Sequence, residues 1–132
     1  MNLASVRIIV SDVPVAVAFY EQVTDLSARW ATDQFAELVT PACTLAIAGA
    51  ATVALFGDGV AAPAQNHTAI IEFRVDDVDA EFARLEDIID TFVQPPTTMP
   101  WGNRSVLFRD PDGTLVNLFT PVTAEAVQRL GG

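Results

Sequence analysis

An internal repeat constrains the fold of this chain more than any other feature. Residues 6–10 (VRIIV) and 68–75 (TAIIEFRV) read as strands, and each is followed by an acidic turn and then a stretch with helical spacing of apolar residues. Sliding the sequence by 65 residues places Val10 on Val75 and Asp12 on Asp77. Two copies of one supersecondary unit are too few for a solenoid, so the repeat predicts two α+β modules.

Aspartates mark the start of each predicted helix. Asp12 is placed to cap a helix over 13–23, and the acidic run 76–79 precedes a second helix that ends near Ile89. Negative charge at a helix N-terminus is stabilising. Helix capping, rather than metal binding, therefore explains the acidic run.

A strand–turn–strand signal closes the second module. Two apolar runs, 105–108 and 114–119, flank the turn sequence Asp110–Gly113, in which proline presets φ and glycine tolerates a positive φ. Residues 41–45 lie 70 positions before 111–115, so the later strands repeat as well. The predicted boundaries, all within one domain over 1–132, are module one at about 3–56, a turn-rich linker at about 57–66, module two at about 67–121 and a C-terminal tail at 122–132.

Composition narrows the function classes. The formal charge of −10 disfavours nucleic-acid and anionic membrane partners. No apolar run is long enough for a membrane span, and no signal peptide is predicted. The single cysteine, Cys43, excludes an intrachain disulfide and fits the cytoplasm, where we expect it to be a buried hydrophobe. Lysine is absent, which excludes Schiff-base chemistry on this chain.

Three motifs together resemble the vicinal oxygen chelate superfamily, which includes glyoxalase I, extradiol dioxygenases and the bleomycin- and mitomycin-resistance proteins. They are V-S-D-V-P-x-x-V-A-F-Y (10–20), V-D-D-V-D-A (75–80) and F-R-D-P-D-G-T-L-V-N-L (108–118). The resemblance implies two tandem βαβββ modules that form a cupped, mostly antiparallel sheet. It implies no single function, because the family mixes enzymes with passive binders.

By this resemblance, the metal-ligand positions fall on four strands that line the cup. They map onto Ser5, Ile47, Ile70 and Asn117. Isoleucine has no donor atom, and serine and asparagine offer weak neutral oxygens, whereas transition metals prefer imidazole, carboxylate or thiolate. We therefore expect no metal, no cofactor and no catalytic residue. A non-enzymatic role is favoured over an enzymatic one.

Two alternatives remain open. The first is a glyoxalase-like lyase, isomerase or dioxygenase with a relocated metal, held by Glu72 together with Glu37 and His67. His67 is the chain's one histidine, and we expect it to point away from the cup. The second alternative is a regulatory module whose cup binds no small molecule.

The favoured hypothesis is a metal-independent binding protein for a planar aromatic antibiotic or metabolite, assembled as a homodimer. Trp101 and Arg104 fit the Trp-Gly-x-Arg pattern of the mitomycin-resistance type, and indole offers a flat face for stacking. Arg7 and Glu72 occupy equivalent repeat positions, either as a structural ion pair or as ligand contacts. Trp101 can equally cover the edge of the core. The candidate ligand-binding residues are Trp101, Asn117, Arg7, Glu72, Arg104, Trp30, Phe35, Ser5, Ile47 and Ile70.

Overall fold

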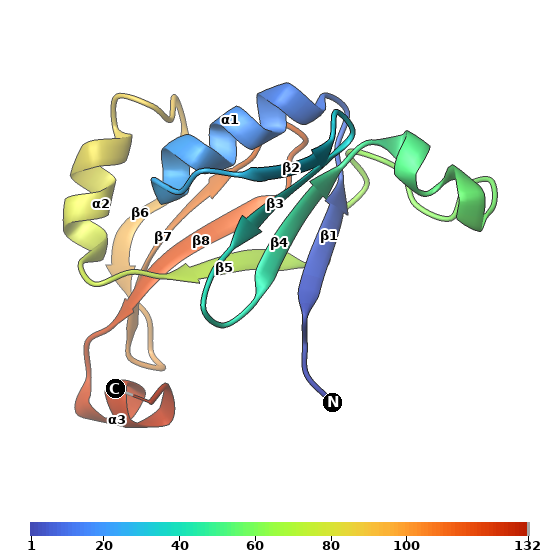
Figure 1. The fold of residues 1–132 in the computed structure, drawn as a ribbon. Coiled ribbons are helices and arrows are strands. Elements are labelled where there is room, and N and C mark those ends of the chain that lie inside the picture. The colour runs from blue at the N-terminus through green and yellow to red at the C-terminus, as the bar shows by residue number, and fades with distance from the viewer. Residues whose placement is uncertain (132) are drawn as a thin grey trace. The chain divides into compact units, whose positions relative to one another are not determined.

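The computed structural model describes residues 1–131, which divide into two compact units (Figure 1). The first unit comprises Met1–Asn66 and the turn Pro111–Gly113, and the second comprises His67–Asp110 and the described chain from Thr114 onward. Gly132, which belongs to the predicted tail, lies outside the described residues. Each unit has the order strand, helix and three strands, so the chain has the predicted α+β fold of two βαβββ modules.

The first unit is built on a four-stranded sheet with one long helix. Its elements are β1 (Ser5–Ile9), α1 (Val13–Thr24), β2 (Arg29–Thr32), β3 (Phe35–Val39) and β4 (Thr44–Ala48), followed by short 3₁₀ turns at Ala50–Thr52 and Ala54–Phe56. The strand order is β1-β4-β3-β2, in which β4 runs parallel to β1 and antiparallel to β3.

The second unit repeats this topology. Its elements are β5 (Ile70–Arg74), α2 (Val78–Leu85), β6 (Phe92–Thr98), β7 (Asn103–Arg109), β8 (Leu115–Pro121) and α3 (Ala124–Arg129). The strand order β5-β8-β7-β6 matches that of the first sheet, and β8 again runs parallel to β5. The predicted tail thus contains a helix, α3, that sequence reasoning did not predict. None of the described helices has the length and apolar character that crossing a membrane requires.

Both module helices begin at the predicted aspartates. The carboxylate of Asp12 accepts a hydrogen bond from the amide of Val15 at 3.1 Å, and that of Asp77 accepts from two amides of α2 at 3.1 Å each. Each cap satisfies donors that the first helical turn leaves without partners. α2 ends at Leu85 rather than near Ile89, although Ile89 is still buried.

Each long helix packs on one face of its own sheet (Figure 1). α1 contacts β3 and β4, whose fully buried side chains include Leu38 and Ile47. α2 packs on the second sheet. There the ring centroids of Phe82 and Phe92 are 4.8 Å apart, and those of Phe92 and Phe108 are 6.1 Å apart. We call the opposite face of each sheet, which no helix of its own unit covers in the described chain, its open face.

The predicted turn joins β7 to β8. The carboxylate of Asp110 is buried and accepts a hydrogen bond from the amide of Thr114 at 2.9 Å, while Gly113 has a φ of +88°. Asp112 belongs to the first unit, where it accepts hydrogen bonds from the amide and hydroxyl of Ser11 at 2.8 and 2.7 Å. These contacts support a structural role for the turn.

Candidate functional site

The open face of the second sheet carries a hydrogen-bonded polar pair, Glu72 on β5 and Asn117 on β8. The two residues are register partners, and Nδ2 of Asn117 donates to Oε2 of Glu72 at 2.8 Å. Asn117 is 8% exposed, and its Oδ1 is buried without a hydrogen-bond partner. A buried acceptor without a donor costs about 1–3 kcal/mol. This oxygen is therefore a point at which a ligand donor would be favourable.

A second buried amide oxygen lies on the same face. Asn103 on β7 also has an Oδ1 without a partner. β7 pairs Leu107 with Asn117, and Asn103 lies an even number of positions before Leu107, so its side chain shares that face. Sequence reasoning passed over Asn103. The predicted strand, 105–108, did not reach Asn103, whereas alternation of side chains along β7, which begins at Asn103, identifies it.

The open face of the first sheet carries a guanidinium between two aromatic rings. The Cζ atom of Arg7 lies 5.6 Å from the ring centroids of both Phe35 and Phe56. This distance is within the cation–π range, in which an exposed pair contributes about 0.5–1 kcal/mol. Ala46 and Ala48 are 2% and 0% exposed and lie on the same face, so the side chains next to Arg7 on β4 are small.

Arg7 keeps its hydrogen-bonding capacity. Within residues 1–131, the contacts found for the Arg7 guanidinium are the two rings, and it takes part in no ion pair or hydrogen bond there. Its row across the sheet continues through Ala46 to Glu37. A guanidinium held by two rings, with five N–H donors available, can orient an acceptor group of a ligand.

Six of the ten predicted ligand-binding residues lie on the open faces, three in each unit. Glu72 accepts a hydrogen bond from Asn117, whereas Arg7 lies against two aromatic rings. Neither residue forms an ion pair within the described part of its own unit. The six are Ser5, Arg7 and Phe35 in the first unit and Ile70, Glu72 and Asn117 in the second.

Ile47 lies on the opposite face, against the prediction. β4 pairs with β1 so that Arg7 is joined to Ala46, just as Glu72 is joined to Asn117. Ala46 is therefore the counterpart of Asn117, and the offset of 70 residues used for Ile47 is one residue too short. A slip of one residue turns a strand side chain to the other face, and Ile47 is fully buried on the helix-covered side.

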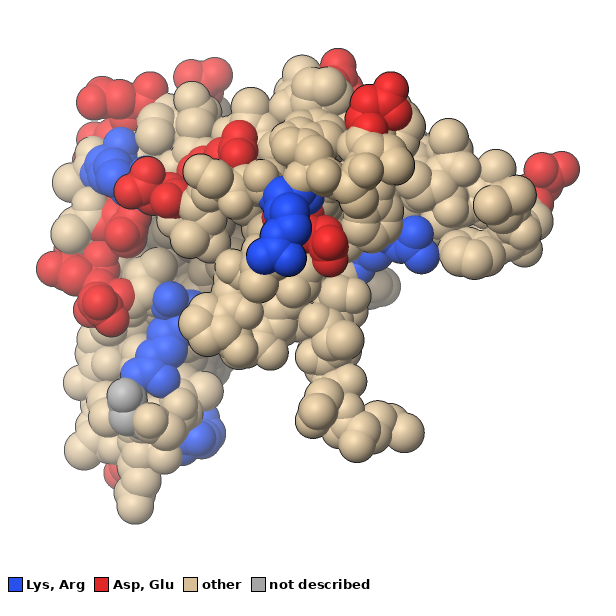
Figure 2. Space-filling model, in the orientation of Figure 1, with Lys and Arg blue, Asp and Glu red and all other residues tan. Residues whose placement is uncertain are grey.

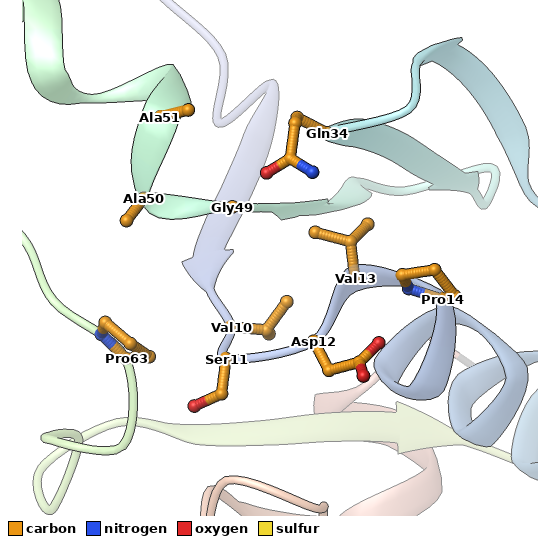
Figure 3. Close-up of a pocket in the computed structure, with 10 residues that line it drawn as sticks. All are labelled: Val10, Ser11, Asp12, Val13, Pro14, Gln34, Gly49, Ala50, Ala51 and Pro63. Atoms are coloured by element: carbon orange, nitrogen blue, oxygen red, sulfur yellow. The ribbon is translucent and has the colours of Figure 1, made fainter.

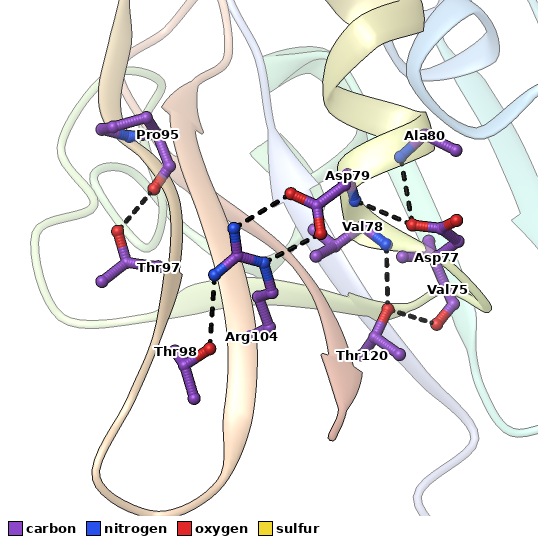
Figure 4. Close-up of polar contacts among 10 residues, drawn as sticks. All are labelled: Val75, Asp77, Val78, Asp79, Ala80, Pro95, Thr97, Thr98, Arg104 and Thr120. Carbon is purple, nitrogen blue, oxygen red and sulfur yellow. Dashed lines mark hydrogen bonds and ion pairs between the residues drawn. The ribbon is translucent and has the colours of Figure 1, made fainter.

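Arg104, which was predicted as a ligand-binding residue, also lies on the helix-covered face. Its guanidinium binds both carboxylate oxygens of Asp79 on α2, at 2.8 and 3.0 Å, and reaches Thr98 at 3.3 Å (Figure 4). The hydrogen bonds of this pair lower the pKa of Asp79 and raise the pKa of Arg104, and desolvation opposes both shifts. Arg104 therefore ties β7 to α2.

The two tryptophans lie outside the strand positions that make up the open faces. Trp30 pairs with Ala36, which is fully buried on the helix-covered face of the first sheet. Trp101 occupies the turn between β6 and β7, where its carbonyl accepts a hydrogen bond from Arg129 at 3.2 Å and its side chain is largely exposed. The aromatic rings on the open face of the first sheet are instead Phe35, which was predicted, and Phe56, which was not.

An open pocket of about 420 Å³ lies in the first unit, where β1 leads into α1 (Figure 3). Asp12 already caps α1, Ser11 already binds Asp112, and the amide of Gln34 lies over Gly49. The polar groups that line this pocket do not converge on one point, so the open faces are the stronger candidates for a binding site. The pocket is lined by Val10, Ser11, Asp12, Val13, Pro14, Gln34, Gly49, Ala50, Ala51 and Pro63.

Comparison with known proteins decides the family. Residues 2–118 match the family model of the Glyoxalase/Bleomycin resistance protein/Dioxygenase superfamily. The chain belongs to this superfamily. The resemblance drawn from the three sequence motifs is thereby confirmed.

Solved structures share the superfamily fold over nearly the whole chain. A protein described as a conserved domain protein is 30% identical with a TM-score of 0.73, over 92% of this chain and 99% of that one. A glyoxalase/bleomycin resistance protein/dioxygenase from Nocardioides is 20% identical with a TM-score of 0.77, over 94% and 85%. A lactoylglutathione lyase from Agrobacterium tumefaciens is 21% identical with a TM-score of 0.72, over 90% and 92%. The last two likenesses show the fold alone. No curated protein matches the chain.

The superfamily's metal-ligand positions do not fit a metal in this chain. The resemblance placed them at Ser5, Ile70 and Asn117, and the strand registers replace Ile47 by Ala46 as the fourth position. These side chains supply a hydroxyl, a neutral amide and two hydrocarbon groups, whereas divalent transition metals prefer imidazole, carboxylate or thiolate. We therefore derive no step through a metal at these positions.

The proposed ligands of the relocated metal site are divided between the two units. Glu37 belongs to the first unit, and Glu72 and His67 belong to the second. Within residues 1–131, no three His, Cys, Asp or Glu side chains are grouped closely enough to hold an ion together. His67 is exposed where the linker meets the second module.

Proposed function

We propose that this superfamily member binds a planar aromatic small molecule, an antibiotic or a metabolite, without a metal and by sequestration. The observation that carries the proposal is the position of the Arg7 guanidinium between the rings of Phe35 and Phe56. An apolar surface with a few placed polar groups is typical of small-molecule sites. Here the rings supply flat apolar faces, and the guanidinium supplies donors for an acceptor on the ligand.

The charge of the chain supports a small-molecule partner over a nucleic acid. The formal charge is −10, and acidic side chains gather around α2 (Figure 2). A surface of this kind repels a phosphate backbone. The proposal also places the protein in the cytoplasm, in keeping with the free thiol of Cys43, and as a homodimer, in keeping with exposed apolar side chains such as Ile70. Light scattering of the full chain tests the dimer.

The binding experiment compares a flat ligand with one of the same charge that is not flat. 1-Naphthoate and cyclohexanecarboxylate are titrated into the full chain in EDTA, with calorimetry as the readout. Naphthoate should bind more tightly, because its ring can stack on Phe35 and Phe56. Arg7→Met should weaken binding about tenfold, since a hydrogen bond to a charged group contributes about 1.5–3 kcal/mol.

Arg84→Met is the matched control, because it removes a guanidinium from the exposed side of α2 in the second unit. It should leave the affinity for naphthoate unchanged. Equal affinities for the two carboxylates, or equal losses in the two arginine variants, would contradict the proposed site.

A further inference from the structure

The contact with Glu72 determines how the Asn117 amide is turned. A carboxylate accepts hydrogen bonds and donates none, so the amide nitrogen must face Glu72. The 2.8 Å contact between Nδ2 and Oε2 has this arrangement. The amide oxygen consequently points away from Glu72 and is buried without a donor. The described protein does not satisfy this oxygen.

Glu72 adds further acceptors at the same place. Its side chain is exposed, and the Asn117 amide is the one hydrogen-bond donor to its carboxylate within residues 1–131. A carboxylate has about four acceptor positions, so most of them are available. The neighbouring cation on β5, Arg74, is engaged elsewhere, because it donates to the carbonyl of Leu130 at 2.9 Å. The pair is thus rich in acceptors and poor in donors.

We propose that Glu72 and Asn117, both in the second unit, bind a planar N–H donor group of a small molecule, of the amidine, guanidine or amino-heterocycle class. The inference rests on the proposed small-molecule function and names a ligand class for the second unit. Two parallel N–H groups fit a carboxylate in a two-point contact, and such charge-assisted bonds are stronger than neutral ones. Because Oδ1 of Asn117 is buried, a side chain must move to admit the donor. Glu72 is exposed and contacts the Asn117 amide, so it is the side chain that moves. A further N–H group then satisfies Oδ1 of Asn117.

Two probes of similar size and opposite hydrogen-bonding character test this inference. Benzamidine and benzoate are titrated in EDTA into the ¹⁵N-labelled full chain, and the side-chain amide signals of Asn117 are followed. Benzamidine should shift these signals. Glu72→Gln should weaken benzamidine binding about tenfold or more, because a hydrogen bond to a charged group contributes about 1.5–3 kcal/mol. Glu86→Gln, at the exposed end of α2, removes the same charge and should leave the affinity unchanged.

The outcomes separate this inference from the proposed function. Benzamidine binding that is unaffected by Glu72→Gln, or that leaves the Asn117 signals in place, overturns the inference. Benzoate binding that is weakened by Arg7→Met, without any response to benzamidine, also overturns it but supports the proposed function. The absence of a response to either probe counts against both.

Discussion

Gly102 follows Trp101 with a φ of +92°, and a Cβ built on it would lie 2.1 Å from Oγ1 of Thr123 and 2.9 Å from Cβ of Ala126. Thr123 caps α3, so the turn and the start of this helix are in close contact. The Trp-Gly pair that suggested a ligand site thus has a packing explanation at the glycine. Trp101 itself is 58% exposed.

Gly102→Ala should destabilise the protein more than Gly113→Ala does. Gly113 has a similar φ of +88°, but nothing lies within 4 Å of its added Cβ. A left-handed conformation costs a residue with a Cβ about 1–2 kcal/mol, and this should be the whole loss at Gly113. At Gly102 the collision adds about 1 kcal/mol or more, because the helix must shift. Denaturant unfolding measures both variants, and equal losses would show that the contact is not tight.

At the scale of the elements, local signals were more predictable than strand register. Asp12 and Asp77 marked both helix starts correctly, because a cap acts within one turn of the chain. The face of Ile47 was wrong, because register depends on pairing between distant strands. The first strands repeat with an offset of 65 residues, but the paired positions on β4 and β8 do not share the offset of 70. A single sequence does not reveal where such an offset changes.

The side on which Arg104 lies was missed for a related reason. Its assignment came from a motif resemblance, whereas its direction is set by alternation along β7. Arg104 pairs with Thr120, and the next position, Ser105, lies on the open face. Alternation predicts that neighbouring strand residues face opposite sides, so Arg104 could not share a face with Ser105. The bounds of β7 place Arg104 on the face opposite Ser105, but the motif alone did not supply those bounds.

The contact between α2 and β7 should depend on pH through Asp79. Its pKa is lowered from 3.8 by the hydrogen bonds from Arg104. A carboxyl with a lowered pKa stabilises the fold above its unfolded-state value, and this contribution is lost as pH falls through the folded-state value. The difference in free energy of unfolding between the wild type and Asp79→Asn should therefore be constant near neutral pH and shrink below about pH 4.

Urea unfolding between pH 7 and pH 3 measures this difference. Arg104→Met should show the same pH-dependent loss, because the shift in the pKa of Asp79 requires its guanidinium. The pair is largely exposed, so the effect should be small and should weaken further in high salt. A difference that stays constant down to pH 3 would show that the ion pair does not persist in solution.

At the scale of the whole molecule, the two units share a topology but differ in the chemistry of their open faces. The first presents a guanidinium between two rings, and the second presents a carboxylate with a buried amide oxygen. The repeat was visible in the sequence because helices and strands need similar patterns in both units. Part of the chemical difference was visible too, because Arg7 and Glu72 occupy equivalent repeat positions. The contributions of Phe56 and Asn103 were not, because Phe56 lies in a 3₁₀ turn after its sheet and Asn103 was recognisable only after the bounds of β7 were known.

The donor set predicts that the whole protein retains no transition metal. The purified chain is incubated separately with nickel, zinc, manganese and iron(II), dialysed, and analysed for bound metal. For each metal, we expect the ratio of bound ion to protein chain to stay well below one. The four ligand positions provide no imidazole, carboxylate or thiolate. EDTA should also leave the thermal midpoint unchanged, since removing a bound structural ion would lower it. A stoichiometric ion would overturn the metal-independent proposal, and Glu72→Gln would then show whether the one acidic side chain beside Asn117 is a ligand.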